Sequence, residues 1–164
     1  MTVSNFDQWK ELDEAYAQFS NAKAQYFKLR EVAKQSIDVA EEFRFGSPGI
    51  SREIAFEKAK DLSIEERKNI FPDIVAYASY VHGFTEASRD LILGLPREWV
   101  LLNIEKVADP ILKNGSHEEY SALLDLYKLI SPSLFDSLIR RCAMSDDLEI
   151  REIAFDYAQK TKPK

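Results

Sequence analysis

Arg52–Phe56 reads Arg-Glu-Ile-Ala-Phe, and Arg151–Phe155, near the other end of the chain, reads the same five residues. The similarity extends to both sides, since residues 50–59 align with residues 149–158. Self-similarity at a distance is typical of proteins that are built from repeated structural units. The repeat therefore guides the prediction of the fold, and it favours a binding function over a catalytic one.

The composition indicates a single helical domain that covers residues 1–164. A chain of 164 residues is long enough to bury a hydrophobic core without disulfides or metals. The hydrophobic fraction of 45% and the charged fraction of 30% are ordinary for a globular protein. Only five Gly and six Pro are present, which is few for a sheet protein with many turns. We therefore expect an all-α fold.

The N-terminal segment, residues 1–45, is expected to form a helical cap. Residues 5–45 contain neither Gly nor Pro, and apolar residues recur there at every third or fourth position. This stripe is compatible with one long helix or with two antiparallel helices hinged at Ser20-Asn21. Because most globular helices do not exceed about 20 residues, we favour two helices. Trp9, on the stripe, is then expected to lie in the core.

Residues 46–160 show shorter helical segments, separated by clear stop and start signals. Residues 46–49, Gly-Ser-Pro-Gly, read as a loop. Ser63 with Glu66, and Ser116 with Glu119, have the spacing of a capping box at a helix start. Prolines at helix starts and glycines at helix ends supply the remaining boundaries, and Pro110 is expected to kink or break its helix. The expected helices are 50–61, 63–72, 72–82, 85–95, 96–115, 116–130, 131–143 and 145–159.

The repeat can be followed inside this region. Arg89 and its neighbours match Arg52, and a weaker match places unit starts near residues 52, 89, 120 and 151. A spacing of about 30 to 40 residues is typical of stacked helix pairs. The pattern of Ser145–Ala154 resembles the second helix of a HEAT or armadillo-like repeat, and the resemblance covers residues 46–160. It implies an irregular α-α superhelix of helical hairpins.

The same resemblance implies a role for the recurring arginines. In HEAT-like repeats such an arginine braces a neighbouring unit through a carboxylate. Arg52, Arg89 and Arg151 are the corresponding residues here, with Asp146 or Asp147 as a candidate partner.

No catalytic or metal-binding constellation is present in the sequence. There is no Gly-rich phosphate loop, no Cys-x-x-Cys and no His-Glu-x-x-His. Cys142 lies in an apolar helical stretch and is expected to be a buried core residue. His82 and His117 adjoin helix ends, where they are expected to serve as local caps or surface residues. We therefore predict a protein that is not an enzyme and needs no cofactor or metal.

Charge and targeting signals narrow the class of partner. The net charge of −6 disfavours binding to nucleic acid or to an anionic membrane surface, and it favours a basic protein partner. The N-terminus has no secretory pattern, and no apolar run is long enough to span a membrane. Together with the lone thiol, these features predict a cytoplasmic protein.

The sequence therefore predicts a binding module, most specifically a small acidic immunity protein that neutralises a basic toxin domain. Two alternatives stay open: a HEAT-like enzyme of the DNA glycosylase type, and an adaptor or regulatory repeat protein. The oligomeric state is also open, because a long N-terminal helix could support self-association. The predicted contact surface combines acidic helix starts with one aromatic helix face: Glu118, Glu119, Asp146, Asp147, Glu149, Tyr77 and Tyr80.

Overall fold

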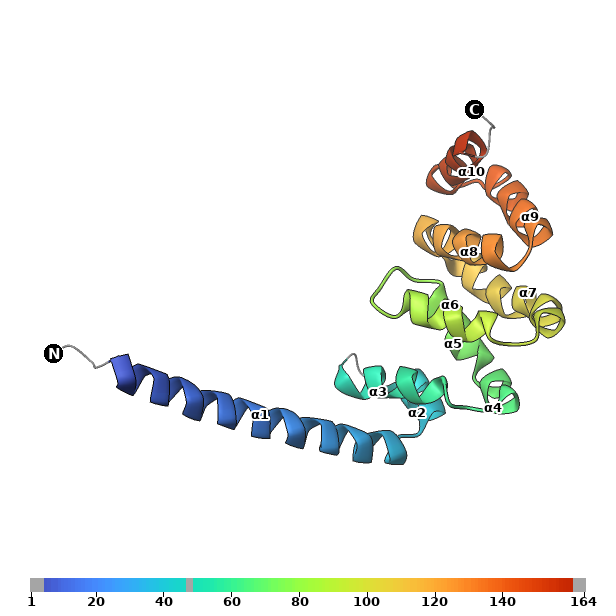
Figure 1. The fold of residues 1–164 in the computed structure, drawn as a ribbon. Helices are drawn as coiled ribbons and strands as arrows, with labels where there is room; N and C mark the ends of the chain where they lie inside the picture. Colours follow the sequence, from blue (N-terminus) through green and yellow to red (C-terminus); the bar gives the residue numbers. More distant parts are fainter. Residues whose placement is uncertain (1–4, 47–48, 161–164) are drawn as a thin grey trace.

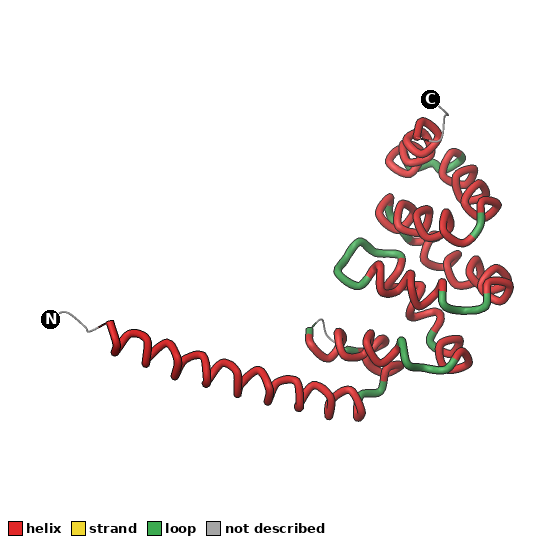
Figure 2. The backbone as a smooth tube through the Cα atoms, in the orientation of Figure 1, coloured by secondary structure: helices red, strands yellow, loops and turns green. Residues whose placement is uncertain are grey.

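The computed structural model describes residues 5–46 and 49–160, and all regular structure in these ranges is α-helical (Figure 2). The predicted all-α fold class is confirmed. The predicted loop at residues 46–49 falls partly outside the described residues. The described ranges contain ten helices: α1 Asn5–Ser36, α2 Val39–Phe45, α3 Ile50–Ala59, α4 Ile64–Asn69, α5 Phe71–Ala78, α6 Thr85–Leu93, α7 Arg97–Asn114, α8 His117–Ile130, α9 Pro132–Ala143 and α10 Leu148–Lys160.

Helices α2 to α10 form one body in which each helix packs mainly on helices close to it in the sequence (Figure 1). Helix α5 packs on α6 and α7, and α8 packs on α7, α9 and α10. The buried side chains of this body form one hydrophobic cluster, which extends from Val39 in α2 to Ala154 in α10. Burial of this apolar surface is the main source of the body's stability.

Helix α1 is a single continuous helix, so the preferred prediction of two helices hinged at Ser20-Asn21 is wrong. The local sequence offers no Gly or Pro to end the helix, and neighbouring alanines favour its continuation. The chain turns only after Ser36, where the Asp38 carboxylate caps α2 by accepting a 3.0 Å hydrogen bond from the Glu41 N–H. Helix α1 projects away from the body, as Figure 1 shows. Trp9 is 64% exposed, so its prediction as a core residue is also wrong.

Two polar joints attach the C-terminal end of α1 to α3. The Arg30 guanidinium lies 2.5 Å from the Glu57 carboxylate, and the Lys34 ammonium lies 2.7 Å from Asp61 just after α3. The Arg30–Glu57 hydrogen bond is the largest cause that lowers the pKa of Glu57 below its ordinary value. These contacts hold α1 at one end only.

Local helix signals placed several boundaries correctly. Both predicted capping boxes are formed: the Ser63 N–H donates to Glu66 at 2.8 Å, and the Ser116 N–H donates to Glu119 at 2.7 Å. Pro132 opens α9 directly after Ser131, as expected from its fixed φ angle.

Two other boundaries differ from the prediction. Helix α5 ends at Ala78 instead of His82, because the chain turns around Thr85: its hydroxyl accepts from the His82 N–H at 3.0 Å and donates to the Tyr80 carbonyl at 2.5 Å. Pro110 does not break α7, which continues to Asn114. Proline removes one backbone hydrogen bond, but Pro110 is exposed, so water can hydrate the carbonyl that is left without its donor.

The recurring arginines connect neighbouring segments. The Arg52 guanidinium lies 3.9 Å from the Glu42 carboxylate and donates to the carbonyl of Gly46, at the end of α2. Arg89, on α6, lies 3.7 Å from Asp125 on α8. Each of these two arginines thus contacts a carboxylate of another helix, but the carboxylates are those of Glu42 and Asp125, not of Asp146 or Asp147. Arg151 instead donates to the Ser145 carbonyl at 2.6 Å, within its own loop and helix.

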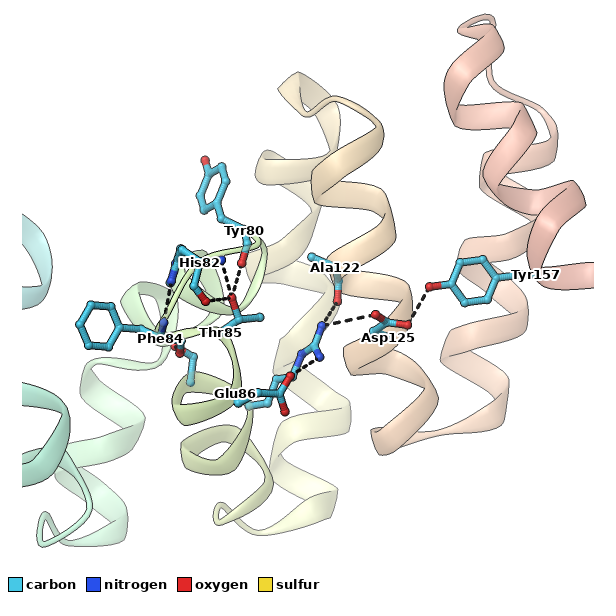
Figure 3. Close-up of polar contacts among 10 residues, drawn as sticks. Tyr80, His82, Phe84, Thr85, Glu86, Ala122, Asp125 and Tyr157 are labelled. Atoms are coloured by element: carbon cyan, nitrogen blue, oxygen red, sulfur yellow. Dashed lines mark hydrogen bonds and ion pairs between the residues drawn. The ribbon is translucent and has the colours of Figure 1, made fainter. Parts of the chain in front are cut away.

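A polar ladder that begins at Arg89 crosses three helices, and its contacts with Ala122, Asp125 and Tyr157 can be followed in Figure 3. Besides its contact with Asp125, the Arg89 guanidinium donates to the Ala122 carbonyl of α8 at 3.2 Å. Asp125 in turn accepts a 2.7 Å hydrogen bond from the hydroxyl of Tyr157 on α10. The ladder links α6, α8 and α10 beside the hydrophobic cluster, against which Tyr157 also packs.

Candidate functional site

An aromatic hollow lies at the surface between α2, α5 and the loop that follows α5. Its volume is about 260 Å³, several times the roughly 30 Å³ that one water molecule occupies in the liquid. We call it the aromatic hollow, and it is lined by Phe43, Ala76, Tyr77, Tyr80 and His82. The structure brings the predicted pair Tyr77 and Tyr80 into one site, but not as one helix face, because α5 ends at Ala78 and Tyr80 lies in the loop that follows.

Tyr77 is held in place on several sides. Its hydroxyl donates to the Phe43 carbonyl at 3.3 Å, and its ring lies 5.4 Å from the rings of both Phe43 and Phe56. The Arg52 guanidinium lies 5.1 Å from the centre of the same ring, which is within the range of a cation–π contact. Burial raises the pKa of Tyr77, so the phenol stays neutral near pH 7. This wall of the hollow is therefore rigid and uncharged.

Tyr80 forms the exposed side of the hollow. It is 46% exposed, and its ring points away from the helices in Figure 3. Its backbone is nonetheless fixed, because the Tyr80 carbonyl accepts from Thr85, and Thr85 is itself buried. An exposed aromatic ring on an anchored backbone loses little conformational entropy on binding, and such residues are common anchors at protein interfaces.

His82 completes the hollow as a neutral group. Its Nδ1 accepts a 3.0 Å hydrogen bond from the Phe84 N–H, so the side chain organises the local turn. Burial is the largest cause that lowers the pKa of His82 below its ordinary value. The prediction of a local structural role for His82 is confirmed, but the residue also lines the hollow.

The acidic part of the predicted surface lies on other helices, at the starts of α8 and α10. Glu119 is occupied by its capping box with Ser116. Asp147 caps α10, since its carboxylate accepts from the Glu149 N–H at 2.8 Å. Glu149 lies 3.0 Å from the His117 ring nitrogen, which joins the two helix starts.

Four of the five predicted carboxylates are exposed, and of these Glu118 and Asp146 are the better placed for an external cation. Glu119, Asp147 and Glu149 also have intramolecular partners. In the recognition of a partner, the acidic groups would therefore contribute chiefly a diffuse negative potential. The aromatic hollow would contribute a defined shape.

Sequence reasoning missed Phe43 and Arg52 as parts of this site. Phe43 was recognisable only as the last apolar residue of the N-terminal stripe. Arg52 was recognised as a bracing residue, and its contact with Tyr77 depends on how α3 packs beside α5. Neither relationship has a local signal in the sequence.

Reactive chemistry has little support among the described residues. No group of three or more His, Cys, Asp or Glu side chains is arranged there to hold a metal ion. Cys142 is fully buried, and burial raises the pKa of its thiol to about 11, so it is a poor nucleophile. In the same ranges, no helix combines the length and apolar character needed to span a bilayer.

No family model, curated protein or solved structure matches this chain.

Proposed function

We propose that this protein binds another protein without catalysing a reaction, and that the aromatic hollow is the centre of the contact surface. The observation that carries the proposal is the combination of an exposed ring at Tyr80 with a rigid apolar wall at Tyr77 and Phe43. Interfaces concentrate their binding energy in a few such aromatic residues.

The charge of the chain supports a basic partner. The net charge is −6, and Glu118 and Asp146 present exposed carboxylates near two helix starts. Complementary charge speeds association and orients the partner as it approaches. A lysine or arginine of the partner is also attracted by the faces of aromatic rings. The most specific form of the proposal is a cytoplasmic immunity protein that neutralises a basic toxin domain.

We further propose that α2 to α10 form an irregular superhelix of HEAT-like hairpins. Packing mainly between neighbouring helices supports this arrangement. The polar ladder supports it too, because Arg89 and Ala122 are 33 residues apart and Asp125 and Tyr157 are 32 residues apart. Both spacings fall within the range of about 20 to 45 residues that one structural unit occupies in stacked repeat proteins.

The first experiment is a tagged pull-down from the lysate of the source cell, followed by identification of bound proteins by mass spectrometry. We expect one basic protein in stoichiometric amount. Cells that express this protein should then survive expression of the captured partner. Loss of viability despite a stable complex would contradict the immunity role, and recovery of nucleic acid alone would contradict protein binding.

The second experiment locates the contact surface with a matched pair of variants. Tyr80→Ala removes the exposed ring, whereas Val81→Ala shortens the neighbouring residue, which is also exposed and does not line the hollow. We expect Tyr80→Ala to weaken binding of the captured partner by about tenfold or more in calorimetry, and Val81→Ala to leave it nearly unchanged. Equal effects would place the interface elsewhere.

A further inference from the structure

Helix α1 carries a row of large apolar side chains that no other part of the described chain covers. Tyr16 is 70% exposed and Phe19 is 62% exposed, although both are aromatic. We call this row the α1 seam, and it consists of Trp9, Leu12, Tyr16, Phe19 and Tyr26. A contiguous apolar surface of this kind marks an interaction site.

The α1 seam has the spacing of a coiled coil. Positions 9, 12, 16, 19, 23 and 26 follow one another at alternating steps of three and four, which keeps them on one side of a helix. Lys23 occupies the single interior position of the seam that is not apolar. The same spacing then reaches Arg30 and Ala33, at the end of α1 that packs on α3. The seam therefore continues an interface that is already formed inside the chain.

Charges along α1 are divided between its two halves. Residues 10–14 contain three acidic side chains and one lysine. Residues 20–28 contain Lys23 and Lys28 and no acidic residue. Two copies of α1 in parallel would place like charges together, whereas two antiparallel copies place the acidic half of each against the basic half of the other.

We propose that α1 pairs with α1 of a second copy of this chain as an antiparallel two-stranded coiled coil. In the register that stacks the seam on itself, Tyr16 lies opposite Phe19 of the other copy, and Trp9 lies opposite Tyr26. Leu12 lies opposite Lys23, whose ammonium group reaches the acidic side chains among residues 11–14. The small residues Ala15 and Ala22 face each other at the flank, which lets the helices approach closely. A lysine inside a seam disfavours other registers.

A second copy fits the α1 seam better than a membrane surface does. Helices that lie on anionic bilayers carry mainly Lys and Arg on their polar face. Residues 10–14 of α1 instead have a net negative charge, which an anionic bilayer would repel. Pairing of two copies buries the seam of each, and it leaves the two helical bodies at opposite ends with both aromatic hollows accessible.

Sedimentation equilibrium of the purified full chain tests the pairing. We expect a reversible dimer that dissociates more readily at high salt, because salt screens the complementary charges. Phe19→Asp places a charge in the seam and should weaken dimerisation by roughly 100-fold. Val32→Asp is the matched control: Val32 is also exposed on α1 but lies outside the seam, so the dimer should persist. Circular dichroism verifies that both variants stay helical. A monomer at all concentrations, or equal effects of the two variants, would overturn the proposal, as would vesicle binding by a monomeric chain.

Cysteine crosslinking tests the orientation. A mixture of Ala15→Cys and Ala22→Cys chains should form a disulfide between the two variants, while neither variant alone crosslinks with itself. The native Cys142 is fully buried and does not compete. Crosslinks between identical positions would show a parallel pair and would overturn the antiparallel arrangement. Both measurements use the protein without any partner, so their outcome is independent of the proposed binding function.

Discussion

The hydroxyl of Tyr157 donates a 2.7 Å hydrogen bond to the carboxylate of Asp125, and so it connects α10 to α8. The same Asp125 lies 3.7 Å from Arg89, which extends the connection to α6. Tyr157 also contacts Phe135 of α9 edge to face, with ring centres 5.7 Å apart. The last helix is therefore fixed by a polar contact on one neighbour and an aromatic contact on another.

Removal of the Tyr157 hydroxyl should weaken the attachment of α10 to α8. We expect Tyr157→Phe to lower the free energy of unfolding by about 1 kcal/mol, because Asp125 loses a donor while the aromatic contact with Phe135 remains. Urea unfolding followed by circular dichroism measures the change. Tyr80→Phe is the control, since Tyr80 is an exposed tyrosine, and we expect a change below about 0.5 kcal/mol. Equal stability of Tyr157→Phe and the natural chain would show that the hydrogen bond contributes nothing.

Gly115 is required by close packing between α7 and α8. A Cβ atom at this position would lie 2.9 Å from the Ile111 carbonyl oxygen and 3.0 Å from the Cβ of Glu119. We expect Gly115→Ala to destabilise the protein by about 1–3 kcal/mol, because the backbone or the capping box must shift. At Gly83 a Cβ would meet no heavy atom within 4 Å, so Gly83→Ala should be nearly neutral. Thermal unfolding of the two variants distinguishes these cases.

The joint between α1 and α3 should weaken in acid. The pKa of Glu57 is lowered in the folded chain, first by the hydrogen bond from Arg30. A lowered pKa means that this stabilisation is present above the ordinary glutamate pKa, and it is lost as the pH falls through the lowered value. We expect Glu57→Gln to reduce the melting temperature near pH 7, and the difference from the natural chain to shrink below about pH 4. A constant difference across this range would contradict the role of the Glu57 charge.

Cys142 should react slowly in the folded protein. Its thiol is fully buried on α9, and burial raises its pKa to about 11. Because the thiolate is the reactive form, we expect modification by a disulfide reagent at pH 8 to be at least about 100-fold slower than in urea. A fast reaction in the native state would show that α9 opens locally, and its rate would then measure that opening.

Sequence reasoning succeeded where a structural outcome depends on adjacent residues. Ser63 and Ser116 each lie three residues before a glutamate, and both capping boxes form as expected. Pro132 likewise opens α9 directly after Ser131, as its fixed φ angle predicts. These relationships are set by helix geometry, so they can be predicted without knowledge of the tertiary structure.

Sequence reasoning failed where the outcome depends on which other segments surround a helix. The apolar row on α1 has the same periodicity whether it is buried or exposed. The pattern therefore could not show whether Trp9 lies in the core or at the surface. Likewise, His82 and Phe43 belong to one hollow only because α2 packs beside α5. Such long-range neighbours leave no mark in a single sequence.

The attachment of α1 at one end gives the chain the mechanics of a lever arm. Trp9 and Arg30 are separated by about 32 Å along the helix axis, at 1.5 Å per residue. A rotation of roughly 10° about the Arg30–Glu57 joint would therefore carry the tip through about 6 Å. A small repacking of α3, such as a partner could cause by pressing on the neighbouring helices, would be magnified into a large displacement at the far end of the molecule.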